Sequence, residues 1–532
     1  MERLLVNETS VIETRSGRIR GAVSDGIHRF KGIPYGDTTA GKNRFQQAQP
    51  VKPWAGVRDT TDFGFRAPQL LEPSSGLTWR NWIRDQRNIS EDCLVLNVYT
   101  PAINNKSKRP ILFYIHGGGF VSGSGSVAGA DGTIMAKKGD VVVVTLNHRL
   151  NAFGHLYLAD VCTGVDGERF ADAGNNGILD IIAALKWVRD NIAAFGGDAG
   201  NVTLFGQSGG ASKVAVLMAM PVAQGLFHKA VIQSASSLIR MATPEEAACS
   251  TQALLGELGL SRDGNGIAAL QDAPMDKLLE ARRRAVAAAG DNFRPVVDGR
   301  TLHAHPFDPV APATAADIPL LIGTCESELT FALGTNPANF KLTQAEAQRR
   351  VALFVGIDDS RALKLMAAYR STRPATSPSD IMIAIMSDQM YRRNDILAAE
   401  RKAAQAASGG APAWMYLFTW KAPVLGGMLK TPHTLCIPFV FGTVDAARDM
   451  LGTGEDRYAL SDRVMGAWLA FARHGNPNHK GLPQWQPYSG AARSTMIFDN
   501  ECKLVDDPLR EDRLTISEYP SYTPDASARR AG

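Results

Sequence analysis

The segment NVTLFGQSGGASKVAVLMAM, residues 201–220, carries the strongest indication of how this chain folds. Its apolar start is typical of a buried strand, its end is compatible with a helix, and the GQSGG between them matches Gly-x-Ser-x-Gly. A Cβ at either glycine would collide with neighbouring chain, because the serine backbone is sharply bent in such a turn. The pattern predicts an exposed Ser208 at a helix N-terminus, as a candidate nucleophile. A tight glycine turn without chemistry is the alternative at this point.

Strand-like and helix-like segments alternate on both sides of this turn. An amphipathic stretch predicts a helix at 177–195, and short apolar runs predict strands at 111–115, 141–146, 202–205, 229–233 and 319–323. The run VVVVTLN is almost continuously apolar, which is typical of a strand buried on both faces. The alternation predicts an α/β fold in which helices flank a large, mostly parallel central sheet.

A second glycine-rich turn, HGGGF at 116–120, directly follows the apolar run ILFYI. Consecutive glycines allow backbone N–H groups to point into one cavity, where they can stabilise an oxyanion. We therefore expect Gly118 and Gly119 to donate hydrogen bonds in an oxyanion hole, with Gly209 as the third donor. A flexible glycine loop is the alternative, but two glycine turns that each follow a strand favour an active site.

The composition of the 532 residues is that of a globular protein, with 45% hydrophobic and 21% charged residues. The formal net charge is only +4 and no long run of Lys and Arg is present, so a nucleic-acid partner is not expected. No apolar run is long enough for a signal peptide or a membrane span, which predicts a cytoplasmic protein. The six cysteines lack the paired spacing of a zinc site, so no metal is expected.

Two long segments are rich in Ala, Leu, Glu and Arg, and they predict helical insertions at about 247–289 and 343–408. The segment 70–91 contains two tryptophans and has neither a helical nor a strand period. It is either a mobile flap over a pocket or a surface loop that is anchored by its tryptophans. The tail 521–532 is expected to be loosely ordered.

Several blocks of sequence follow one another along the chain as they do in a known family. They include RFKGIPYG (29–36), SEDCLVLNVYTP (90–101), HGGGFVSGSG (116–125), GNNGILD (174–180) and PFVFG (438–442). With the two glycine turns, these blocks resemble the type B carboxylesterases, the family that includes the cholinesterases. The resemblance implies one α/β-hydrolase domain over 1–520, with helical insertions around a deep pocket. It also implies that the protein hydrolyses small-molecule esters without a metal or an organic cofactor.

The resemblance also implies which residues act together with Ser208. Position-by-position matching of GTCESELT to the family assigns the acid to Glu328, with Glu326 as the alternate two residues away. The segment PHTLCIPFVFG corresponds to the segment that carries the family's histidine, and this match assigns His433. The resulting chain order of serine, acid and histidine is that of α/β hydrolases.

The chain departs from the family near these residues. Gln207 precedes the candidate nucleophile and Cys436 follows the histidine by three residues, at positions where the family usually has acids. The loss of two nearby carboxylates disfavours the protonated form of His433, so we expect the acid limb of the pH–rate profile at lower pH. Cys93 lies where the family often forms a disulfide, but its partner position is occupied by Ala67, so that bridge cannot form.

The expected activity is the hydrolysis of carboxylic esters through an acyl-enzyme on Ser208. An amidase, a carbamate hydrolase or a lactonase can use the same residues, and a non-catalytic binding module is a further alternative. The structural ion pairs that the family implies are Arg44 with Glu91 and Arg149 with Asp180. Candidate residues of the pocket wall are Trp79, Trp82, Phe331 and Met428.

Overall fold

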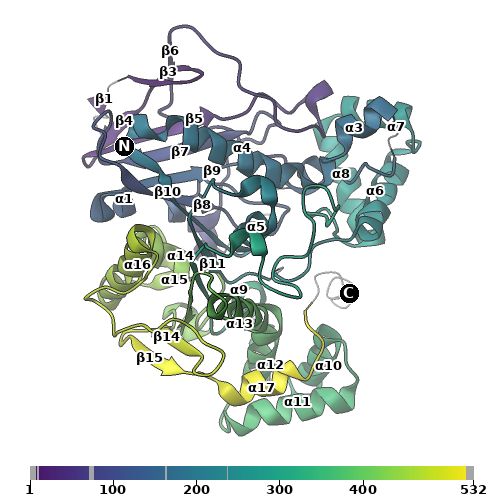
Figure 1. Ribbon diagram of the computed structural model, residues 1–532. Coiled ribbons are helices and arrows are strands. Elements are labelled where there is room, and N and C mark those ends of the chain that lie inside the picture. Colours follow the sequence, from purple (N-terminus) through teal and green to yellow (C-terminus); the bar gives the residue numbers. More distant parts are fainter. Residues whose placement is uncertain (1–6, 9–10, 71–76, 162–163, 237, 523–532) are drawn as a thin grey trace.

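The computed structural model describes residues 7–8, 11–70, 77–161, 164–236 and 238–522. A 12-stranded sheet runs through its centre (Figure 1). In spatial order its strands are β1 (Asn7–Glu8), β4 (Ala22–Ser24), β5 (Ile27–Pro34), β7 (Val95–Thr100), β9 (Val142–Leu146), β8 (Arg109–Ile115), β10 (Gly197–Gln207), β11 (Lys229–Gln233), β12 (Leu320–Cys325), β13 (Ala413–Phe418), β14 (Ser494–Phe498) and β15 (Lys503–Asp506). A separate 3-stranded sheet contains β2 (Ile12–Thr14), β3 (Gly17–Arg20) and β6 (Val57–Asp59).

The middle of the large sheet is parallel and its two edges are antiparallel. From β9 through β8, β10, β11, β12 and β13 to β14, each strand runs parallel to its neighbour. Strand β10 pairs with β8 through Gly206 and Ile115, so these two strands end side by side. The glycine turns that follow β8 and β10 therefore lie at the same edge of the sheet, where parallel α/β sheets bind ligands. The predicted α/β class with a mostly parallel sheet is confirmed.

Helices cover both faces of the sheet (Figure 1). The α-helices of the described residues are α1 (Thr133–Gly139), α2 (Asn151–Gly154), α3 (Gly164–Phe170), α4 (Asn176–Asn191), α5 (Gly209–Ala219), α6 (Pro244–Leu258), α7 (Gly264–Asp272), α8 (Met275–Ala289), α9 (Thr330–Leu333), α10 (Gln344–Val355), α11 (Asp359–Ser371), α12 (Pro378–Ser387), α13 (Arg393–Ala407), α14 (Cys436–Phe441), α15 (Arg448–Leu451), α16 (Asp456–His474) and α17 (Arg510–Ser517). Helices α4, α5 and α13 contribute to the core on one face, and α1, α14 and α16 contribute to the core on the other.

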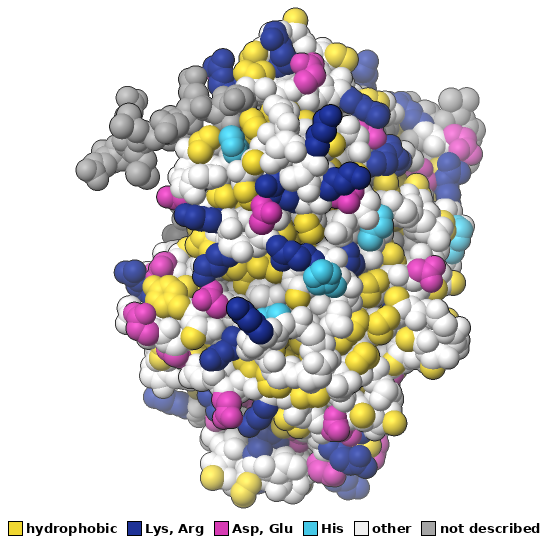
Figure 2. Space-filling model, turned by 60° about the vertical axis from the view of Figure 1, so that its left-hand side comes forward, with side chains coloured by type: hydrophobic (Ala, Val, Ile, Leu, Met, Phe, Trp, Pro, Cys, Tyr) yellow, Lys and Arg dark blue, Asp and Glu magenta, His cyan; other side chains and the backbone are white. Residues whose placement is uncertain are grey.

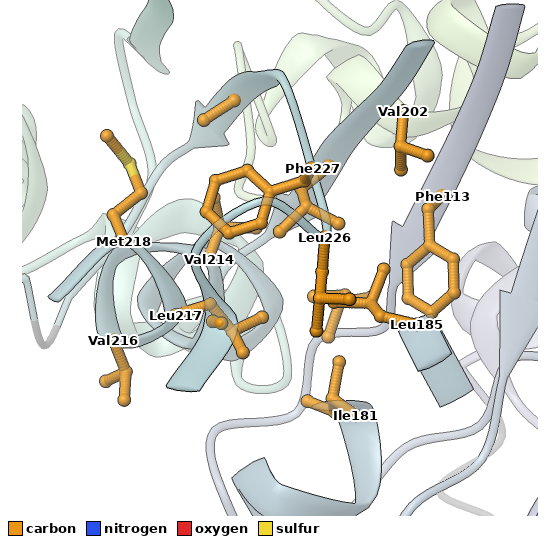
Figure 3. Packing of buried hydrophobic residues seen from close by; sticks show 14 of the residues in the cluster. Phe113, Ile181, Leu185, Val202, Val214, Val216, Leu217, Met218, Leu226 and Phe227 are labelled. Carbon is orange, nitrogen blue, oxygen red and sulfur yellow. The ribbon is translucent and has the colours of Figure 1, made fainter. Parts of the chain in front are cut away.

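Alternation of side chains along β8 shows how one strand serves both cores. Phe113 and Ile115 belong to the core beside α4 and α5, whereas Leu112 and Tyr114 belong to the core beside α14 and α16. Figure 3 shows the ring of Phe113 beside Leu185 of α4. A strand that is buried on both faces has no polar side, which explains why ILFYI is apolar throughout.

Helices occupy both segments that were predicted as insertions. Helices α6 to α8 pack around a core of their own, and α10 to α12 pack around another. Residues 523–532 of the predicted tail, and residues 71–76 of the tryptophan-containing segment, lie outside the described residues. Strands β13 and β14 were missed by the sequence analysis, because a short apolar run has no period that separates a strand from a buried helix.

The helices and the surface can also be compared with the features of membrane and polyanion-binding proteins. No helix within the described ranges combines the length and the apolar character that crossing a bilayer requires. On the face shown in Figure 2, Lys and Arg side chains lie among Asp, Glu and apolar side chains, so both signs of charge are interspersed there.

Candidate active site

Ser208 occupies the sharp turn between β10 and α5. Its backbone angles are φ 59° and ψ −125°, outside the regions that side-chain-bearing residues favour. The backbone N–H of Ser208 donates to Gln233 O at 2.8 Å, which holds the turn. A Cβ at Gly206 would lie 2.5 Å from the carbonyl carbon of Gly210, and a Cβ at Gly210 would lie 2.0 Å from Ile115 O. The collisions predicted for larger residues at both glycines are therefore present.

The glycine loop after β8 lies beside this turn. Gly118 and Gly119 have positive φ angles of 91° and 62°, which glycine adopts without strain. Neither of their N–H groups has a hydrogen-bond partner among the described residues. A Cβ at Gly209 would lie 2.1 Å from Gly119 O, so the start of α5 packs directly on the loop. The fold thus brings the three predicted oxyanion-hole residues together.

His433 and Glu328 form a short, buried pair. His433 Nδ1 lies 2.5 Å from Glu328 Oε2, and the other carboxylate oxygen accepts from Cys325 N at 2.7 Å. The backbone N–H of His433 also donates to Glu328 O at 3.1 Å. The glutamate is 1% exposed and the histidine 7%. Because Glu328 engages Nδ1, the imidazole keeps Nε2 for proton transfer.

Glu326, the alternate acid, does not reach the imidazole among the described contacts. Its backbone N–H donates to Phe418 O at 3.0 Å, and burial raises the pKa of its carboxyl group. Both glutamates lie in the turn after β12, where the charges that act on the Glu326 carboxyl group are those of Lys421, Arg373, Asp388 and Lys430, whereas Glu328 contacts His433. The contact geometry therefore favours Glu328.

The Gln207 side chain lies against the imidazole. Its Nε2 is 3.1 Å from His433 Nε2 and 3.3 Å from His433 Nδ1. Ser208 and His433 line the same pocket, but no hydrogen bond joins Ser208 Oγ to the imidazole within the described part of the chain. The residue that replaces the family's usual acid is thus in direct contact with the predicted base.

Three further residues, Tyr391, Asp395 and Cys436, lie around His433 and Glu328, and the sequence alone did not predict their positions. The Tyr391 ring lies 4.7 Å from the ring of His433, centroid to centroid. Asp395 of α13 is fully buried, which raises the pKa of its carboxyl group well above the usual range, and the charge of Glu328 raises it further. Cys436 Sγ accepts from Gln233 Nε2 at 3.2 Å. No sequence signal marks Tyr391 or Asp395, because their surroundings form only when the segment 388–395 folds against Glu328 and His433.

A pocket of about 670 Å³ opens onto these groups. The residues around it include His116, Gly117, Gly118, Gln207, Ser208 and His433, with Arg66, Arg80, Arg84, Ile83, Phe331 and Ile437. Of the four predicted wall residues only Phe331 lines the pocket. Trp79 is buried behind it, with its ring centroid 5.3 Å from that of Phe331. The tryptophans anchor the segment 77–83 instead of lining the cavity.

The ion pairs expected from the resemblance are formed, and both are buried. Arg44 Nε donates to Glu91 Oε2 at 2.8 Å, and Arg149 Nη2 donates to Asp180 Oδ1 at 2.6 Å. Each guanidinium binds its carboxylate through two nitrogens, the geometry that best compensates the loss of water. The five cysteines that the structure describes, Cys93 among them, are free.

Comparison with known proteins adds to this geometry. Residues 8–517 match the model of the Carboxylesterase family. Para-nitrobenzyl esterase of Bacillus subtilis (strain 168) is 35% identical over 518 residues, which cover 96% of this chain and 99% of that protein. Phenmedipham hydrolase of Pseudarthrobacter oxydans is 30% identical over 517 residues, which cover 95% of this chain and 98% of that protein.

Solved structures agree with the sequence comparison. A carboxylesterase of Geobacillus stearothermophilus, solved at pH 6.2, superposes with a TM-score of 0.81 at 38% identity and covers 95% of this chain and 100% of its own. An esterase from the anaerobe Clostridium hathewayi, described as able to hydrolyse aliphatic aromatic polyesters, superposes with a TM-score of 0.80 at 32% identity and covers 98% and 100%. The amidase, carbamate hydrolase, lactonase and binding-module alternatives are not favoured by these matches.

Proposed function

Because the chain belongs to the carboxylesterase family and is a carboxylic ester hydrolase, we propose that it works through an acyl-enzyme on Ser208. His433 is the general base and Glu328 orients it. The observation that carries this assignment is the 2.5 Å contact between His433 Nδ1 and Glu328 Oε2, in the pocket that also contains Ser208.

The reaction begins when His433 Nε2 takes the proton of Ser208 Oγ as the oxygen attacks the ester carbonyl. The carbonyl oxygen becomes an oxyanion, and the N–H groups of Gly118, Gly119 and Gly209 stabilise it. His433 then gives its proton to the leaving alcohol, which departs as the acyl-enzyme forms. A water molecule activated by the same imidazole releases the acid and restores the serine.

The contact between Gln207 and His433 sets a condition on the first step. His433 Nε2 has to accept the proton from Ser208, yet Gln207 Nε2 lies 3.1 Å from that nitrogen. Catalytic hydrogen bonds are often long or misaligned before substrate binds. In the proposed mechanism the amide of Gln207 gives way to Ser208 Oγ when an ester enters the pocket.

Labelling tests the nucleophile directly. A biotinylated fluorophosphonate should modify Ser208, as located by peptide mass spectrometry, and Ser208→Ala should lose both the label and the turnover of 4-nitrophenyl butyrate. The label on a different residue, or turnover retained by Ser208→Ala, would refute the assignment.

The pocket volume supports small esters as substrates, because cavities of about 300–1,000 Å³ hold drug-sized ligands. A series of 4-nitrophenyl esters of increasing acyl length tests this, since kcat/KM reports how well the pocket accommodates each acyl chain. A matched 4-nitroanilide measures the activity towards amides. Turnover of the anilide that equals turnover of the ester would contradict the assignment as an esterase.

A further inference from the structure

A buried lysine lies directly beneath the glycine loop. Lys213 belongs to α5, five residues after Ser208, and its side chain is fully buried. We propose that Lys213 is a positioning residue of the oxyanion hole, which holds the loop from behind and adds a positive charge to stabilise the oxyanion. This inference rests on the proposed function, because it assumes that Ser208 generates that oxyanion.

Hydrogen bonds from Lys213 and from within the loop hold residues 116–119 in position. Lys213 Nζ donates to His116 O at 3.2 Å and to Gly119 O at 2.8 Å. Between these two carbonyls, Gly117 O lies 2.8 Å from His116 Nδ1, and Gly118 O accepts from Ser122 N at 3.1 Å. Every carbonyl from His116 to Gly119 is thus bound to the protein.

Peptide geometry converts these contacts into an orientation of the N–H groups. The C=O and N–H of a trans peptide point in opposite directions, so a carbonyl that is held fixes the N–H of the next residue. The carbonyl of Gly117 fixes the N–H of Gly118, and the carbonyl of Gly118 fixes the N–H of Gly119. Lys213 binds the peptide units on either side of these two and therefore clamps both ends of the donor segment. Preorganised donors of this kind need no rearrangement when charge develops.

The electrostatic surroundings of Lys213 Nζ determine whether its charge can act on the oxyanion. Among the described residues no carboxylate pairs with Lys213 Nζ, and the Phe120 ring centroid lies 5.5 Å from it. Three histidines, His116, His148 and His155, lie within reach of its charge, and each places Nδ1 against a backbone carbonyl. Burial lowers the pKa of all three rings, to about 3 for His116 and His155, so they are neutral.

The acid that acts on His116, Asp85, is already paired. Asp85 influences His116, but its carboxylate binds Arg87 Nη2 at 2.8 Å and accepts from Ser124 Oγ at 2.7 Å. Arg66 lies 4.0 Å from the same carboxylate. A protonated Lys213 therefore has no carboxylate as counter-ion in the part of the chain that the structure describes, and an oxyanion above the loop would be its partner in the transition state.

The expected size of the charge effect follows from the separation. The path from Nζ to the oxyanion consists of a hydrogen bond to Gly119 O, the backbone of Gly119 and a second hydrogen bond from Gly119 N–H, and it spans about 8 Å. With an effective dielectric constant of about 20, one unit charge at that distance changes the rate about 30-fold. Burial lowers the pKa of Lys213 to about 7. The ammonium is present below this pH and is lost above it, so the stabilisation should decline at alkaline pH.

Two variants separate the two roles. Lys213→Met removes the donors and the charge while keeping the length of the side chain. At a pH below about 7, where the ammonium is present, we expect kcat for 4-nitrophenyl butyrate to fall at least about 30-fold with KM nearly unchanged. Lys213→Gln keeps a donor without the charge, and it should lose less. An alkaline limb that is present in the wild type should be absent from both variants.

Lys402→Met is the matched control. Lys402 is also buried, and its Nζ donates to Ala315 O and Ala316 O, both at 2.8 Å, away from the pocket. This variant should lose stability but keep kcat. If Lys213→Met keeps kcat within threefold of the wild type, or if Lys402→Met loses as much, the proposal is overturned.

A measurement on the wild type covers the case in which the Lys213 variants do not fold. A trifluoromethyl ketone adds to the serine as an oxyanion, whereas the matching methyl ketone binds mostly without adding. The affinity for the trifluoromethyl ketone should weaken as the pH rises above about 7, while the affinity for the methyl ketone stays level. A level profile for both refutes a role for the charge. Failure of the proposed function would look different, because fluorophosphonate would then not label Ser208.

Discussion

Replacing Glu328 by Gln removes the charge behind the imidazole while keeping the shape of the side chain. Glu328 is 1% exposed, and its Oε2 lies 2.5 Å from His433 Nδ1. The glutamine amide has to present either its oxygen or its NH₂ group to Nδ1, and an NH₂ group selects the wrong tautomer.

The magnitude follows from the charges. In the transition state the imidazole is protonated, and its charge centre lies about 4 Å from that of the carboxylate, where one pair of charges contributes about 4 kcal/mol at an effective dielectric constant of about 20. A loss of about 4 kcal/mol corresponds to about a 10³-fold fall in kcat. The histidine remains in place, so KM should change little.

The assay compares kcat and KM for 4-nitrophenyl butyrate in Glu328→Gln and Glu326→Gln, with thermal unfolding measured for both. Glu326 is the matched control, since it is two residues away and lacks a described contact with His433; its variant should keep kcat within about threefold. A Glu328→Gln enzyme that keeps more than a tenth of kcat, or a Glu326→Gln enzyme that loses as much, would refute the reasoning.

Three further predictions concern the surroundings of the site. Gln207→Glu places a carboxylate beside His433, where Gln207 Nε2 now lies 3.1 Å from the imidazole, so the acid limb of the pH–rate profile should move upward; an unchanged or lowered limb counts against this view. Gly210→Ala forces a Cβ to 2.0 Å from Ile115 O and should destabilise the fold by about 2 kcal/mol or more, whereas Gly256→Ala in α6, where a Cβ meets nothing within 4 Å, should be neutral or stabilising in urea unfolding; equal midpoints would contradict the predicted collision. Arg149→Met leaves Asp180 buried without its partner and should cost about 3–5 kcal/mol, and the double variant with Asp180→Leu should recover much of that stability; no recovery would argue against an unpaired charge as the cause.

Local sequence patterns were sufficient to predict the turn around Ser208 and the glycine loop at 116–120. GQSGG and HGGGF each follow an apolar strand, and the close backbone packing around Gly206, Gly210 and Gly209 explains why small residues occupy those positions. The same patterning predicted the parallel centre of the sheet, because buried strands are apolar throughout. These features depend on residues that are neighbours in the chain, or on the side-chain period of a single element.

Long-range packing determined which residues of the site contact one another, and the sequence patterns did not predict these contacts. Glu326 and Glu328 lie two residues apart in one loop, and their different surroundings arise only because His433 approaches from a segment about a hundred positions away. Lys213 has the same origin: in a list of residues it is one lysine on an apolar helix, and only the folded loop places two carbonyls over its Nζ. A contact between distant segments depends on the summed geometry of every element between them, and no local pattern of side chains encodes that sum.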